Sequence, residues 1–173
     1  PMIRAVSACP VPTIAAVNGA AAGAGANLAL AADVVIASEE AVFLQAFARI
    51  GLIPDAGGTY WLPRQIGFAR AMGAALFAEP VSARKAADWG MIWAAVPEEA
   101  FAERWWRRAR ELAVGPTATY RRIKQALREG MANDLETQLM LEAELQGELG
   151  ETRDFREGVL AFLEKRQAQF EGR

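Results

Sequence analysis

Histidine is absent from this sequence, and cysteine occurs once, as Cys9. The lack of histidine excludes Ser-His-Asp and Cys-His catalytic arrangements and most zinc sites. The single cysteine excludes an internal disulfide framework and fits a reducing compartment, so we expect a cytoplasmic protein. A metal would need oxygen ligands alone, and because no suitable carboxylate cluster stands out, we expect no metal site.

An excess of basic residues is also absent, because 19 Lys and Arg residues stand against 21 Asp and Glu residues, a net charge of −2. We therefore expect no nucleic-acid partner. Glycine, asparagine and aspartate interrupt the apolar runs, so we expect no membrane-spanning segment. Hydrophobic residues make up 53% of the chain, which favours a folded protein over a disordered one.

The composition changes near Pro97. Residues 1–96 hold only 6 of the 19 basic and 6 of the 21 acidic residues, and they are rich in glycine and small apolar residues. Residues 97–173 are highly charged and have the pattern of successive helices. We therefore predict an α/β domain over residues 1–96 and a helical region over residues 97–173.

In residues 1–96, short apolar stretches alternate with helical patterns, which is typical of an α/β layer structure. The predicted strands are Thr13–Val17, Val34–Ala37, Ala41–Leu44 and Ile92–Val96. The predicted helices are 25–32, one that begins after Gly57-Gly58, 68–77 and one between Ser82 and Gly90, followed by 98–113, 117–130, 134–149 and 152–168. The last four have narrow apolar faces, so we expect another surface, such as a partner subunit, to cover them.

A glycine-rich segment, "VNGAAAGAGANLAL", links the first predicted strand to the first predicted helix. The spacing does not fit the dinucleotide-binding G-x-G-x-x-G pattern, because the residue three after Gly25 is Leu28, and no Walker A sequence follows. Two interpretations remain open. The small residues could let a substrate carbonyl approach N–H groups at the start of the helix, or they could serve only close packing of the helix on the strand.

Four segments resemble the crotonase superfamily, also called enoyl-CoA hydratase/isomerase. They are "PTIAAVNGAAAGAGANLALAADVVIAS", "AVFLQAFARIGLIPDAGGTYWLPRQIG", "SARKAADWGMIWAAVP" and "DFREGVLAFLEKRQAQF". The resemblance implies an α/β fold, a crotonase-like spiral of ββα units, followed by an α-helical trimerisation region. Within the superfamily, "GLIPDAGGT" and Asn27 most resemble the ring 1,2-epoxyphenylacetyl-CoA isomerases of phenylacetate degradation.

The resemblance implies an acyl-CoA thioester substrate, with coenzyme A as part of that substrate and no separate cofactor. Members of the superfamily stabilise a thioester enolate with two backbone N–H groups. The motif match assigns one of them to Ala24, directly after Gly23, and the other to a segment before the first residue of this sequence. We therefore expect the N-terminal ββα units to be missing, and this chain alone to lack a complete active site.

The two glutamates of the superfamily's hydratases correspond to Asn27 and Phe47, and neither side chain exchanges protons at neutral pH. The resemblance implies instead that Asp55 is a single acid/base group, which suits isomerisation. Asp55 could alternatively cap the helix that begins near Gly57. Asn27 could line the substrate pocket, or it could bond only to backbone.

Phe162 and Lys165 match last-helix positions that contact the coenzyme A nucleotide of a neighbouring subunit in the superfamily. They could also be an apolar anchor and a solvated lysine. We expect an acyl-CoA isomerase that assembles as a homotrimer or hexamer. The alternatives are an enoyl-CoA hydratase of fatty-acid β-oxidation and a catalytically incomplete scaffold.

Overall fold

The computed structural model describes residues 1–173, which form two compact units. Unit 1 comprises Pro1–Cys9 and Thr13–Arg107, and unit 2 comprises Pro10–Pro12 and Arg108–Arg173. The division falls within helix α5 (Glu98–Ala113), which the composition placed entirely in the second part of the chain.

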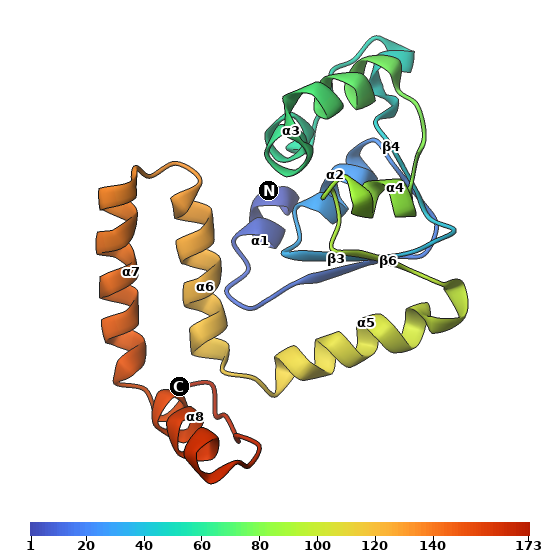
Figure 1. The fold of residues 1–173 in the computed structure, drawn as a ribbon. Helices are drawn as coiled ribbons and strands as arrows, with labels where there is room; N and C mark the ends of the chain where they lie inside the picture. Colours follow the sequence, from blue (N-terminus) through green and yellow to red (C-terminus); the bar gives the residue numbers. More distant parts are fainter. The chain divides into compact units, whose positions relative to one another are not determined.

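Unit 1 contains two three-stranded sheets (Figure 1). One has the order β1-β3-β6 and is entirely parallel, with Ile14 beside Val34 and Ile36 beside Ala94. The other has the order β2-β4-β5, and its β4–β5 pair is antiparallel. The strands are β1 (Ile14–Val17), β2 (Ala20–Ala22), β3 (Val34–Ser38), β4 (Val42–Leu44), β5 (Val81–Ser82) and β6 (Ala94–Val96).

Helices cover both faces of the parallel sheet, as side-chain alternation along β3 requires. Val35 and Ala37 enter the main core, to which α2 and α3 contribute Leu30 and Leu62. Ile36 belongs to a separate small cluster that includes Phe101 of α5. The helical elements of unit 1 before α5 are α1 (Met2–Ser7), α2 (Ala24–Leu30), the 3-10 helix η1 (Ala46–Ile50), α3 (Gly58–Phe77) and α4 (Ala83–Asp88).

The predicted α/β class is confirmed, while several boundaries differ. The helices predicted after Gly58 and over residues 68–77 form the single element α3, which is interrupted at Gly67, where φ is 77° and ψ is 161°. Sequence patterns missed α1, β2, η1 and β5, each of which has at most six residues. Such short elements contain too few residues to show a hydrophobic period.

Unit 2 is entirely helical apart from its connections and contains α6 (Thr117–Gly130), α7 (Leu135–Gly150) and α8 (Arg153–Glu164). Helix α7 packs against both α6 and α8. An ion pair between Arg122 and Glu148, at 2.5 Å, joins α6 to α7. Few side chains of this unit are buried: they belong to Leu145, Asp154 and Ala161.

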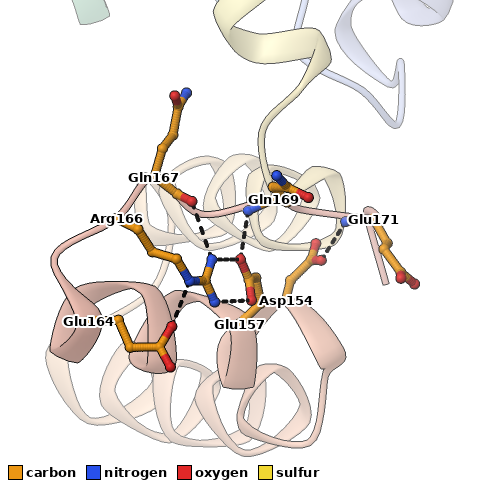
Figure 2. Close-up of polar contacts among 7 residues, drawn as sticks. All are labelled: Asp154, Glu157, Glu164, Arg166, Gln167, Gln169 and Glu171. Carbon is orange, nitrogen blue, oxygen red and sulfur yellow. Dashed lines mark hydrogen bonds and ion pairs between the residues drawn. The ribbon is translucent and has the colours of Figure 1, made fainter.

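The C-terminal segment folds back along α8, as Figure 2 shows. The sequence predicted a helix to residue 168, but α8 ends at Glu164 because Lys165 adopts a left-handed conformation with φ 55°. Two carboxylates of α8 hold the returning chain. Asp154 accepts from the backbone N–H groups of Glu171 and Gly172 at 2.7 and 2.9 Å, and Glu157 accepts from that of Gln169 at 2.8 Å.

None of these helices combines the length and the apolar character that a bilayer crossing requires.

Candidate active site

The glycine-rich segment forms a tight turn between β2 and α2. Gly23 has φ 53° and ψ −126°, a conformation that favours glycine, and its N–H donates to the carbonyl of Leu44 at 2.8 Å. Ala24 is the first residue of α2 and is exposed. Since the first N–H groups of a helix have no acceptor within the helix, the Ala24 N–H is available to an external oxygen atom.

Asn27 lies one turn further along α2 and is fully buried, with 0% of its surface exposed. Its Nδ2 donates to the main-chain carbonyl of Asp55 at 2.9 Å, and its Oδ1 accepts from Nε2 of Gln45 at 2.8 Å. In this structure, both polar atoms of the Asn27 amide have protein partners. The predicted contact of Asn27 with substrate stays a prediction.

Asp55 lies in the turn that precedes α3, and it is exposed. Its main-chain carbonyl accepts from the backbone N–H of Gly58 at 2.8 Å as well as from Asn27. Residue 57 occupies the N-cap position of α3, and no side chain accepts a hydrogen bond there. The alternative in which the Asp55 carboxylate caps this helix is therefore not what the structure shows.

Gly58 is needed for the approach of α2 to the Asp55 turn. A Cβ atom at position 58 would lie 2.3 Å from Nδ2 of Asn27, far inside van der Waals contact. Phe47, in η1, lies on the other side of the glycine turn and is 8% exposed. A Cβ at Gly23 would lie 3.5 Å from Cζ of Phe47, so this ring packs directly over the turn.

The predicted residues fall into two groups. Gly23, Ala24, Asn27, Phe47 and Asp55 come together in unit 1 through the contacts above.

Phe162 and Lys165 belong to unit 2, at and just beyond the last turn of α8. Phe162 is 82% exposed, and Lys165 is exposed at the left-handed end of the helix. The turned-back tail fixes this end of α8, because Arg166 pairs with Glu157 at 2.6 Å and with Glu164 at 2.6 Å (Figure 2). Both residues are therefore presented on an ordered surface, and their contact with a nucleotide stays a prediction.

Sequence reasoning missed Gln45, which lies between β4 and η1 and is 5% exposed. The available signal was a polar residue directly after a buried strand, in "VFLQAF". Polar side chains are rarely buried without partners, so a glutamine in that position indicates a specific hydrogen bond.

The parallel sheet, the helix that starts at Ala24 and the Asp55 turn agree with the α/β fold expected from the resemblance. Comparisons with known proteins agree. The model of the family described as "Enoyl-CoA hydratase/isomerase" matches residues 1–173. The chain belongs to this family.

Relatives within the family carry both hydratase and isomerase names. The chain is 62% identical over 173 residues to "Probable enoyl-CoA hydratase" of Rhodobacter capsulatus, covering all of this chain and 67% of the relative. It is 51% identical over 173 residues to "1,2-epoxyphenylacetyl-CoA isomerase" of Escherichia coli, covering all of this chain and 66% of the relative. It thus spans about two thirds of the length of the curated relatives that it matches.

A solved enoyl-CoA hydratase from Polaromonas sp. JS666 superimposes with a TM-score of 0.93 at 34% identity, over 98% of this chain and 66% of the other. The predicted family and fold class are therefore confirmed.

Proposed function

We propose that this chain forms part of an acyl-CoA thioester isomerase that uses Asp55 as its single acid/base group. The observation that carries the proposal is the composition of the site. Asp55 is the carboxylate among the five residues that come together there, and Asn27 and Phe47 cannot take up or release protons. A mechanism with one proton-transfer group removes a proton at one carbon and returns it at another, which is isomerisation.

The proposed steps use the Ala24 N–H and the Asp55 carboxylate. A thioester oxygen bound at the Ala24 N–H gains negative charge when Asp55 removes a proton beside the carbonyl, and the N–H stabilises that enolate. Asp55 then returns the proton to a different carbon of the conjugated system. The name of the Escherichia coli relative supports 1,2-epoxyphenylacetyl-CoA as the substrate.

A second candidate is an enoyl-CoA hydratase, which the name of the Rhodobacter capsulatus relative favours. Hydration requires one group to activate water and another to deliver a proton. The site of this chain offers Asp55 alone, so we rank hydration second.

The exposed apolar side chains of unit 2 support a trimer or hexamer, because they need a covering surface. In such an assembly, we propose that Phe162 and Lys165 contact the coenzyme A nucleotide bound to a neighbouring subunit.

The test is Asp55→Asn in the enzyme, assayed with a 3-enoyl-CoA, a 2-enoyl-CoA and the epoxide. We expect the kcat of isomerisation to fall about 10²–10⁴-fold, the usual contribution of a general acid/base. The substitution retains the main-chain carbonyl that Asn27 and Gly58 engage, so the turn is preserved. Asp88→Asn, at the exposed end of α4, is the matched control.

Double-bond shift that survives Asp55→Asn would contradict the mechanism. Hydration as the only activity of the parent would establish the second candidate. An intact assembly without turnover would identify a scaffold.

A further inference from the structure

Two consecutive hydrogen bonds, which meet at the buried side chain of Asn27, link the three segments that hold the predicted active-site residues of unit 1. Gln45, at the start of η1, donates to Asn27 of α2 at 2.8 Å. Asn27 in turn donates to the main-chain carbonyl of Asp55 at 2.9 Å. These two bonds connect η1, which contains Phe47, to α2, which begins at Ala24, and α2 to the turn at Asp55.

The chain of bonds has a fixed direction. A carbonyl oxygen only accepts, so Asn27 must present its NH₂ group to Asp55, and this leaves Oδ1 for a donor. Gln45 must then present its NH₂ group to Asn27. The remaining oxygen of Gln45, Oε1, is buried without a hydrogen-bond partner. The orientation of the Gln45 amide thus supplies the Nε2 donor that Oδ1 of Asn27 requires, and it leaves Oε1 of Gln45 unsatisfied.

Burial makes these bonds consequential. Asn27 is 0% and Gln45 is 5% exposed, so water does not readily replace a lost partner. A buried acceptor that loses its donor keeps its full desolvation penalty, which drives the side chain toward another orientation. If Asn27 reorients, the carbonyl of Asp55 loses its link to α2.

We propose that Gln45 is a positioning residue for the isomerase reaction. Through Asn27 it fixes the main chain at Asp55, and hence the location of the Asp55 carboxylate relative to the Ala24 N–H. This inference rests on the proposed function, because it assigns Gln45 a part in the same site. In this proposal Gln45 acts through Asn27 and takes no part in the proton transfer itself.

The substitution that tests this role is Gln45→Leu, which removes the donor and keeps a side chain of similar bulk. We expect kcat for a 3-enoyl-CoA to fall about 10- to 100-fold, because a misplacement of about 1 Å in a catalytic group has effects of this size. KM should change less than about threefold, since the proposed contacts to coenzyme A, Phe162 and Lys165, belong to the other unit.

Gln65→Leu is the matched control. Gln65 also donates from Nε2 to a carbonyl, that of Leu30 at 3.4 Å, and also has a buried Oε1 without a partner. Its bond does not lead to Asp55. We expect Gln65→Leu to retain kcat within about twofold even where it lowers the melting temperature by as much as Gln45→Leu.

A double-mutant cycle tests whether Gln45 acts through Asn27. We expect Gln45→Leu to reduce kcat no further in an Asn27→Ala background, because the intermediary is then already missing. Equal kcat losses in Gln45→Leu and Gln65→Leu would overturn the proposal. A full additional loss in the Asn27→Ala background would also overturn it.

Amide hydrogen exchange separates this proposal from the proposed function. The N–H of Gly58 donates to the same carbonyl as Asn27, so its exchange rate reports the Asp55 turn without any substrate. If the parent shows no isomerase activity, the proposed function fails. In that case, faster exchange at Gly58 in Gln45→Leu but not in Gln65→Leu supports the positioning role, and equal rates refute it.

Discussion

The two units of this chain are held together in different ways. Unit 1 has a continuous apolar core in which large side chains such as Leu30, Phe43 and Leu62 are at most 2% exposed. Unit 2 buries only two apolar side chains, Leu145 and Ala161, and leaves others such as Leu127 and Met140 about 70% exposed. In unit 2, the carboxylates of Asp154 and Glu157 hold the C-terminal segment against α8 by accepting from its backbone N–H groups. The difference shows that unit 1 can position a site by packing, whereas unit 2 has few buried side chains of its own.

The largest effect should come from removing core volume in unit 1. Leu30→Ala is expected to lower the free energy of unfolding by about 2–5 kcal/mol, because it removes buried methyl groups and leaves a cavity. Leu127→Ala, the same substitution at an exposed helix position of unit 2, should change it by about 0.5 kcal/mol or less. Denaturant titration of both variants measures the contrast.

Equal losses of unfolding free energy in the two variants would contradict the difference between the units. A larger loss in Leu127→Ala that shrinks as the protein is diluted would instead show that a second chain covers this face of α6, because the contribution of a subunit contact disappears when the chains dissociate.

An intermediate effect is expected from Asp154→Asn in unit 2. Asp154 is 2% exposed and accepts from two backbone N–H groups, whereas an asparagine has one oxygen to offer. We expect the tail to open more easily by about 1–3 kcal/mol, so that the amides of Glu171 and Gly172 exchange roughly 5- to 150-fold faster.

Hydrogen exchange measured by NMR gives these rates, with Glu144→Gln on α7 as the exposed control. Unchanged rates at Glu171 and Gly172 would show that apolar contacts, and not the carboxylate, hold the tail.

The smallest effect concerns the exposed pair of Glu157 and Arg166. The guanidinium of Arg166 and the N–H of Gln169 lower the pKa of Glu157 from 4.5 to about 2. Because the folded-state pKa lies below the unfolded one, the pair contributes its stability above about pH 4.5 and loses it as the pH falls toward 2. A carboxyl NMR titration should show a midpoint near 2, with the amide of Gln169 following it.

In Arg166→Gln, the midpoint should move toward 4.5 because the main cause of the depressed pKa is then gone. A midpoint near 4.5 already in the parent would mean that this ion pair does not form in solution.

The sequence predicted those features whose signals are local. The helix predicted between Ser82 and Gly90 is present as α4, and the Ser82 hydroxyl at its start accepts from the N–H of Lys85 at 3.3 Å. The helices at 98–113 and 117–130 have the predicted bounds, because proline and glycine residues mark their ends.

The missed features depend on contacts between distant segments. Gln45 and Asn27 are 18 residues apart, and Asn27 and Asp55 are 28 apart, so no periodicity reports their bonds. The C-terminal tail was predicted to extend α8, since local propensity does not reveal that Asp154 captures N–H groups 17 and 18 residues later. The family resemblance pointed to Asp55, and only the structure shows how its main chain is held.

The close approach of Gly58 to Asn27 makes two positions, 31 residues apart, share one volume. A methyl group at position 58 would occupy the space that the Asn27 amide already fills, so substitutions at the two positions have coupled effects. For protein engineering, this sets an order of steps. A library that varies position 58 while asparagine remains at 27 would sample mainly displaced turns, whereas one that first shortens residue 27 would open space for a side chain at 58.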